Sequence, residues 1–215
     1  KEALVDFDQA LELNPEFTAA WNNRGLVHLA HQDYQAAVTD FGKAATIDGT
    51  YADALNNRGF AKFKMGQLSE ALSDLKRTVE LKPDYTTAWN NCGLVYMEQK
   101  EYALAIEAFS QACQLAPNDI RWLTHRREAL KRLGRYTEAG SDTEKIRWLT
   151  TLQQLTQQTL KQPSVSSVWI ARARHLADGS EFNAAVNDYA RALTLNSADH
   201  EALAGRAEVW LKMGE

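Results

Sequence analysis

Three pairs of adjacent asparagines are the residues of this sequence best suited to bind another molecule. An asparagine amide both donates and accepts hydrogen bonds, so a regular row of amides can hold both polar groups of an extended peptide backbone. Asparagine is also a mediocre helix former, which favours a binding role over a choice made for helix propensity. The alternative is ordinary polar usage on a helix surface. The pairs, spaced 34 residues apart, are Asn22–Asn23, Asn56–Asn57 and Asn90–Asn91.

A basic stretch in the middle of the chain offers a second kind of chemistry. Between residues 120 and 136, six basic side chains accompany a single glutamate, a local net charge of +5 in a chain whose net charge is −4. Such asymmetry attracts an acidic segment to one place and orients it. The alternative is a solvated basic helix face. The basic residues that we expect to face a partner are Arg121, Lys131, Arg132 and Arg135.

The sequence lacks the motifs of catalysis. It contains no phosphate-binding GxxxxGKS/T or GxGxxG loop, no HExxH or CxxC motif and no GxSxG nucleophile turn. His28 and His31 are spaced like one half of a metal site, but no cysteine or carboxylate cluster completes it. We expect Cys92 and Cys113 to be buried free thiols. The sequence therefore predicts a protein that is not an enzyme and holds no metal or cofactor.

Charge and hydropathy argue against two further classes of partner. The net charge of −4 disfavours nucleic acid as the main partner. No run approaches 18 consecutive apolar residues, so no membrane-spanning segment is predicted. The chain begins with KEALVDFDQALEL, which lacks the apolar core of a signal peptide. We expect a cytoplasmic location, and a chain that starts inside a larger protein.

The elements that must position these residues are set by an internal repeat. WNNRGLVHLA begins at residue 21, LNNRGFAKFK at 55, WNNCGLVYME at 89 and LTHRREALKR at 123, each 34 residues after the last. WIARARHLAD follows only at 169, so about twelve residues are inserted, and LAGRAEVWLK at 203 restores the step. Within each copy the apolar residues recur at helical spacing, with glycine or proline near the turns. Each copy therefore predicts two antiparallel helices that must stack on their neighbours.

The repeat resembles the tetratricopeptide repeat (TPR). That pattern has a large apolar residue at repeat position 4, a small one at 8, an aromatic at 11, Ala at 20, an aromatic at 24, Ala at 27 and Pro at 32. In the copy that begins at Thr86, these are Trp89, Gly93, Tyr96, Ala105, Phe109, Ala112 and Pro117. The resemblance implies an all-α, right-handed superhelical solenoid of antiparallel helix pairs. The asparagine pairs, at repeat positions 5 and 6, resemble the asparagine ladder of the TPR superhelix in O-GlcNAc transferases.

The repeat phase predicts two domains. The first, residues 1–163, contains a trailing half-repeat at 1–17, full repeats at 18–51, 52–85 and 86–119, and a degenerate fourth repeat at 120–163 with an elongated second helix. The second, residues 164–215, contains repeat five and a truncated repeat six.

Comparison of the repeats with one another predicts structural ion pairs. Arginine at repeat position 7 is accompanied by aspartate sixteen residues later, and the copy with Cys92 instead of arginine has Ala108 instead of aspartate. If only one member of a buried ion pair were replaced, the other would remain as an uncompensated charge, which explains why both are replaced together. A feature of most repeats belongs to the scaffold rather than to catalysis. The pairs are Arg24–Asp40, Arg58–Asp74, Arg126–Asp142 and Arg172–Asp188.

These observations predict a non-catalytic scaffold that binds an extended segment of a partner protein in its concave groove, and the basic stretch favours an acidic segment. Apolar residues at repeat position 9 would supply anchor contacts beside the asparagines; they are Leu26, Phe60 and Leu94. One alternative is the substrate-recruiting part of a larger enzyme, a glycosyltransferase or a kinase. The other is a module for homo-oligomerisation, in which the elongated helix makes a homodimer.

Overall fold

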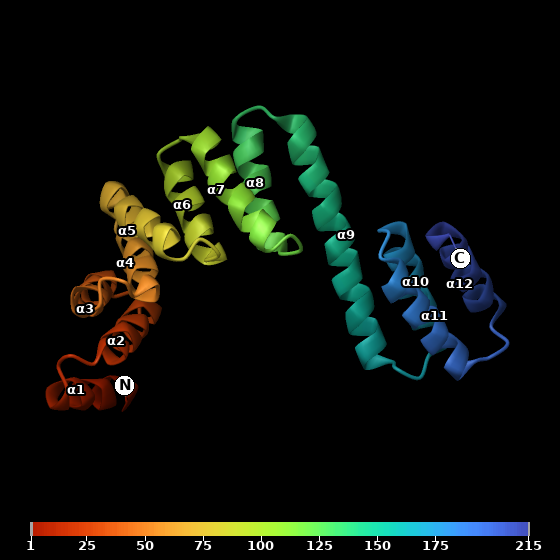
Figure 1. Cartoon of the computed structure of the whole chain (residues 1–215), viewed down its shortest axis with the longest axis horizontal. Coiled ribbons are helices and arrows are strands. Elements are labelled where there is room, and N and C mark those ends of the chain that lie inside the picture. The colour runs from red at the N-terminus through yellow and green to blue at the C-terminus, as the bar shows by residue number, and fades with distance from the viewer. Residues whose placement is uncertain (1, 215) are drawn as a thin grey trace. The chain divides into compact units, whose positions relative to one another are not determined.

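The fold is all-α. The structure, a computed structural model, describes residues 2–214, and within them it contains twelve α-helices and no strand (Figure 1). The predicted all-α solenoid of helix pairs is confirmed. The helices are α1 (Glu2–Leu13), α2 (Thr18–Ala30), α3 (Tyr34–Ile47), α4 (Ala52–Lys64), α5 (Leu68–Leu81), α6 (Thr86–Glu98), α7 (Tyr102–Leu115), α8 (Ile120–Arg132), α9 (Tyr136–Lys161), α10 (Ser166–Asp178), α11 (Phe182–Leu195) and α12 (His200–Met213).

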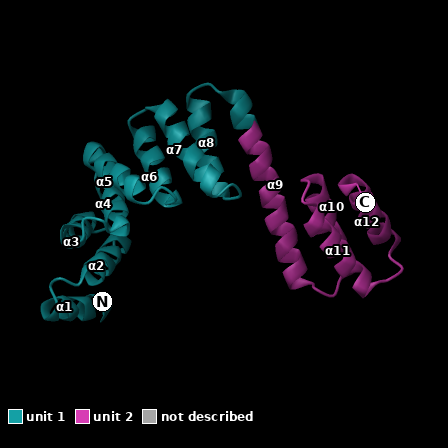
Figure 2. Cartoon of the chain, in the orientation of Figure 1, with its two compact units in different colours: residues 1–140 teal, residues 141–215 magenta. Residues whose placement is uncertain are grey.

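The chain divides into two compact units, residues 1–140 and residues 141–215 (Figure 2). The division falls inside α9, which has 26 residues where every other helix has 12 to 14. The domain boundary that the repeat phase places near residue 163 remains a prediction. The candidate binding residues all lie in the first unit.

The first unit is a row of helix pairs in which α2, α4, α6 and α8 are the first helices of successive repeats. Each first helix contacts the next one, whereas α3, α5 and α7 do not contact one another among the described residues. The first helices are therefore closer together than the second helices, so the row curves with the first helices on its inner side.

No helix within residues 2–214 has both the length and the apolar character that a membrane span requires.

Close packing within a repeat depends on glycine at repeat position 8. A β-carbon added to Gly25 would lie 2.7 Å from the ring of Phe41, and one added to Gly93 would lie 2.4 Å from the ring of Phe109. Both rings are fully buried between the two helices of their repeat. Only a residue without a side chain lets the first helix come this close to the ring on the second.

Tryptophan at repeat position 4 fixes the turn that leads into its own repeat. The indole Nε1 of Trp21 donates a hydrogen bond to the backbone oxygen of Pro15, at 2.8 Å. The same bond, six residues back along the chain, joins Trp89 to Pro83 at 2.8 Å and Trp169 to Pro163 at 3.0 Å. The indole is satisfied by this bond, so its ring serves as apolar packing surface.

Arginine at repeat position 7 ties helices together. Arg24 makes two hydrogen bonds to Asp40 on α3, at 2.8 and 2.7 Å, and a third to Asp8 on α1, at 2.6 Å. The buried carboxylate of Asp40 raises the pKa of Arg24. The forked guanidinium therefore links the second helix of its own repeat to the helix before it.

The same geometry recurs in two other repeats. Arg58 bonds to the buried carboxylate of Asp74 through Nε and Nη2, and Lys62 adds a second cation at 2.7 Å. In the second unit, Arg172 bonds to Asp188 at 2.6 and 2.7 Å and also to Thr159 on α9 at 3.1 Å. The fourth pair, Arg126–Asp142, stays a prediction.

The second unit packs α9 against α10 through a reciprocal contact. Trp148 and His175 stack with ring centroids 5.2 Å apart. The indole Nε1 of Trp148 donates to the backbone oxygen of His175 at 3.2 Å, and the Nε2 of His175 lies 2.8 Å from the backbone oxygen of Trp148. A β-carbon on Gly179 would lie 2.3 Å from the indole, so glycine is needed there.

Candidate peptide-binding site

The six asparagines lie on three consecutive first helices, α2, α4 and α6. Asn22, Asn56 and Asn90, at repeat position 5, are buried, each with about 5% of its surface exposed. At repeat position 6, Asn23 is exposed, Asn57 is half-buried and Asn91 is buried. The helices thus bring all six predicted residues onto one side of the row, at different depths.

Five of the amides form a continuous chain of hydrogen bonds, which we call the asparagine row. The Nδ2 of Asn91 donates to the Oδ1 of Asn56 at 3.0 Å, and Asn56 donates to Asn57 at 3.2 Å. Asn57 donates to Asn22 at 3.1 Å, and Asn22 donates to Asn23 at 3.4 Å. The row therefore holds neighbouring repeats in register, a structural role that the sequence alone did not reveal.

His125 continues this pattern into the fourth repeat. Its Nδ1 lies 2.7 Å from the Oδ1 of Asn90, and it stands at repeat position 6, as Asn57 and Asn91 do. Because the amide oxygen accepts, Nδ1 is the donor of this bond. Burial lowers the pKa of His125, and the nearby charge of Arg121 lowers it further. His125 is the member of the site that motif searching missed; its repeat position was the signal that could have found it.

The apolar residues at repeat position 9 differ in how much surface they present. Leu26 is 40% exposed. Phe60 is half-buried, and its ring centroid lies 6.3 Å from that of Phe63. Leu94 packs against the core that includes Ile106. Leu26 is thus the apolar residue most available to a partner.

Three basic residues of α8 and the turn after it are paired with nearby carboxylates. Three ion pairs, at 2.7, 2.9 and 2.6 Å, are Arg121–Asp119, Arg132–Glu128 and Arg135–Glu138. Asp119 and Glu138 flank the basic stretch, so residues 119–138 carry six basic and three acidic side chains, a local net charge of +3. Lys131 is exposed and makes no ion pair with any residue between 2 and 214.

His28 and His31, the two histidines with the spacing of a metal-binding pair, lie apart from any cluster of metal-ligating side chains among the described residues. His28 lies 3.8 Å from Asp40 and 4.0 Å from Asp33, and His31 is exposed. Within the described part of the chain, no three histidine, cysteine, aspartate or glutamate side chains come together as metal ligands would. Cys92 and Cys113 are buried and form no disulfide.

Family profiles identify this arrangement of helices. Profiles described as "Tetratricopeptide repeat" match residues 1–54 and 86–119, and one described as "TPR repeat" matches residues 61–100, together more than half of the chain. The chain belongs to the tetratricopeptide repeat family. A search of curated proteins finds no match.

Solved TPR structures have the same fold. One is the structure of MamA, residues 41 to the end, from Desulfovibrio magneticus RS-1, which is 25% identical in sequence. The match covers 70% of this chain and 85% of the MamA chain, with a TM-score of 0.66. YrrB, titled a TPR protein with an unusual peptide-binding site, is 17% identical, covers 94% and 97%, and has a TM-score of 0.59. The first TPR of Spaghetti (RPAP3), bound to the HSP90 peptide SRMEEVD, is 20% identical, covers 54% and 93%, and has a TM-score of 0.53.

Proposed function

We propose that this TPR protein is an interaction scaffold whose asparagine row binds an extended segment of a partner protein. The observation that carries the proposal is the row itself, a line of amides that crosses α4 and joins α2 to α6 on the inner side of the first unit. Leu26, a large apolar residue beside it, is 40% exposed. A polar line next to an apolar contact suits a segment that alternates anchor side chains with backbone contacts.

The row keeps hydrogen-bonding capacity for such a segment. Each amide nitrogen has two hydrogens, and each bond within the row uses one of them. The exposed Asn23 accepts a bond from Asn22, and its own amide nitrogen makes no hydrogen bond within residues 2–214. An extended segment brings unpaired backbone carbonyls that need donors when they leave water. The exposed Asn23 and the half-buried Asn57 offer such donors without reading the side chains of the segment.

The comparisons support peptide binding only at the level of the fold. Two structural neighbours, YrrB and the RPAP3 domain, are described as binding peptides. Whether the asparagine row itself binds a peptide is tested by substituting its residues.

The test uses a phage-displayed library of random twelve-residue peptides, selected on the whole chain and depleted on its N57A/N91A variant. A peptide that survives is synthesised, and its affinity is measured by fluorescence polarisation. We expect each lost neutral hydrogen bond to cost about 0.5–1.5 kcal/mol, or roughly two- to tenfold in Kd. N23A, which removes the most exposed amide, should weaken the same peptide by a similar factor.

Asn183→Ala is the matched control, because Asn183 is an exposed helix-surface asparagine of α11, outside the row. It should leave the affinity unchanged. Asn57 and Asn91 also join repeats, so circular dichroism melts must show that N57A/N91A remains folded at the temperature of the binding assay. Equal affinity of every selected peptide for folded N57A/N91A, N23A and the wild-type chain would refute the proposal.

A further inference from the structure

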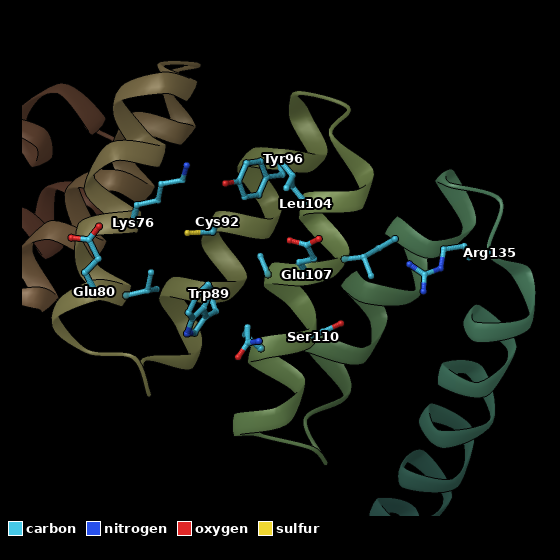
Figure 3. Close-up of a pocket in the computed structure, with 13 residues that line it drawn as sticks. Lys76, Glu80, Trp89, Cys92, Tyr96, Leu104, Glu107, Ser110 and Arg135 are labelled. Atoms are coloured by element: carbon cyan, nitrogen blue, oxygen red, sulfur yellow. The ribbon is translucent and has the colours of Figure 1, made fainter.

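A pocket of about 720 Å³ lies between α5 of the second full repeat and α6 and α7 of the third (Figure 3). Lys76 and Glu80 line it from α5, Trp89 and Cys92 from α6, and Glu107 from α7. These α6 residues occupy repeat positions 4 and 7, on a different face of the helix from the asparagines at positions 5 and 6. The pocket is therefore separate from the asparagine row.

In other repeats an arginine fills the equivalent place. Arg24 reaches from α2 to Asp8 and Asp40, which stand on the helices at either side of it. Its guanidinium carbon also lies 4.6 Å from the centroid of the Trp21 ring. In the second unit, Arg172 bridges α9 and α11 in the same way and lies 5.0 Å from the Trp169 ring.

The third repeat lacks the arginine and both carboxylates of this arrangement. Cys92 replaces the arginine, Ala108 replaces the aspartate, and Lys76 stands at the position of Asp8. No side chain of α6 makes polar bonds to both α5 and α7 as Arg24 does to α1 and α3, and α5 and α7 do not contact each other among the described residues. Trp89 is retained, but no cation lies over its ring within residues 2–214. The pocket includes the place that the arginine occupies in the other repeats.

The floor of the pocket is apolar. Cys92, Ala108, Val79 and Ile106 line it, each at most 9% exposed. Burial raises the pKa of the Cys92 thiol to about 12. A charged side chain inserted here would lose its hydration without finding the buried carboxylate that Asp40 or Asp188 provides elsewhere.

The rim, in contrast, is charged. Lys76 and Glu107 are exposed on opposite walls, and neither makes an ion pair with any other residue of the described chain. Glu80 and Arg135, also at the rim, are already paired with Arg77 and Glu138. An apolar floor inside a polar rim is the usual anatomy of a binding hot spot.

We propose that this pocket binds one large apolar side chain, leucine, methionine or phenylalanine, from a partner protein. The side chain would lie on the Trp89 ring and over Cys92 and Ala108, where the stem of the arginine lies in the other repeats. The polar backbone on either side of it would meet Lys76 and Glu107. The volume is within the range of sites that hold small ligands, so it also admits the flanking backbone.

The test uses peptide selection with a filled pocket as the negative target. A phage-displayed library of random twelve-residue peptides is selected on the whole chain and depleted on C92R/A108D, a variant that restores the arginine–aspartate pair of the other repeats. We expect the surviving peptides to share one leucine, methionine or phenylalanine. A synthetic copy should bind C92R/A108D at least about tenfold more weakly, and should lose a similar factor when that residue becomes alanine.

Two controls make the outcome specific. Ala108→Leu fills the floor without adding charge, and it should weaken binding even if C92R/A108D fails to fold. Asn183→Ala, at an exposed residue of α11 outside both the pocket and the asparagine row, should bind the peptide as the wild-type chain does. The two selections use different depletion variants, so this test and that of the asparagine row succeed or fail separately.

Three results would overturn the proposal. The first is a shared arginine or lysine in the surviving peptides. The second is equal affinity for the filled and open pockets, or no peptide that survives depletion. The third is a concentration-dependent dimer that C92R/A108D abolishes, because the occupant would then be a second copy of the chain.

Discussion

His125 takes the place that Asn57 and Asn91 hold in the two preceding repeats. All three side chains bond to the asparagine 35 residues earlier, at repeat position 5 of the repeat before. Unlike an amide, the imidazole ring titrates near neutral pH. The contact between α6 and α8 therefore contains a group whose charge can change while the other contacts of this kind stay neutral.

This difference predicts a pH-dependent stability. Burial lowers the pKa of His125 in the folded chain, whereas the unfolded chain keeps the ordinary value of about 6.5. Below pH 6.5 the unfolded chain therefore binds more protons, and the free energy of unfolding falls as the pH falls. Asn90 and the charges of Arg121 and Asp119 surround the ring, and of the two charges Arg121 adds to the destabilisation. Urea unfolding at pH 7.5 and pH 5 should show a smaller loss of stability in His125→Gln than in the wild-type chain.

His31→Gln is the matched control, because His31 is exposed at the end of α2. This variant should lose stability between the two pH values as the wild-type chain does. Parallel stability curves for His125→Gln and the wild-type chain would contradict the role given to His125.

The sequence shows where the asparagines lie but not which atoms they meet. A period of 34 residues is enough to place Asn57 and Asn91 at equivalent points of successive helices. Their bonds to Asn22 and Asn56 depend on how one helix is shifted along the next, and a period contains no such information. The Trp21–Pro15 bond could have been found, because a tryptophan six residues after a proline occurs in three repeats.

At the scale of the elements, helix pairs follow from the sequence because each repeat has its own apolar periodicity and turn. The sequence also indicates how close the two helices of a repeat come, because glycine recurs at repeat position 8. The division of the chain inside α9 was not predicted, since the helical pattern there runs without interruption from residue 136 to residue 161. Apolar periodicity in the sequence indicates that a helix is continuous, but it does not indicate which elements the helix packs against.

Gly93→Ala should separate α6 from α7. Its β-carbon would lie 2.4 Å from the fully buried ring of Phe109, so the ring or the helix must shift. Overpacking of this kind costs about 1–3 kcal/mol. The free energy of unfolding, measured by urea titration and circular dichroism, should fall by that amount.

Gly140→Ala provides the control, because a β-carbon at this position of α9 has no neighbour within 4 Å. Alanine is the better helix former, so this variant should gain up to about 1 kcal/mol. Equal effects of the two substitutions would show that helix propensity, rather than the distance between α6 and α7, governs stability at repeat position 8.

At the scale of the whole molecule, charge is distributed unevenly although the total is small. Residues 119–138 carry +3 in a chain of net charge −4, so the remainder carries −7. Residues 120–136 alone carry +5. The local charge is smaller over residues 119–138 because Asp119 and Glu138, which pair with Arg121 and Arg135, lie just outside the shorter stretch. Which charges neutralise one another depends on the turns at both ends of α8, and the sequence alone did not indicate their geometry.

Lys131→Glu should slow the association of an acidic peptide with the chain. The substitution lowers the local charge from +3 to +1, and the field that steers an acidic partner depends on that net charge. Stopped-flow association rates at low salt should fall severalfold, while dissociation changes little. The effect should shrink at physiological salt, where exposed charges are screened beyond about 8 Å.

Lys43→Glu is the control for total charge, because Lys43 is an exposed residue of α3, far along the sequence from the basic stretch. It changes the net charge of the chain by the same amount and should affect association less. If both variants slow association equally, total charge rather than its location controls the encounter.

The hydrogen bonds of the asparagine row all run the same way, starting at Asn91, passing through Asn56, Asn57 and Asn22, and ending at Asn23. Turning any inner amide over would break the bond on each side of it, so the amides can reverse only in concert. The row therefore has a head and a tail, although its members are chemically identical. A peptide backbone is ordered in the same sense, from amino end to carboxyl end. A segment laid along the row and the same segment laid in reverse would therefore meet different groups at the two ends of the row.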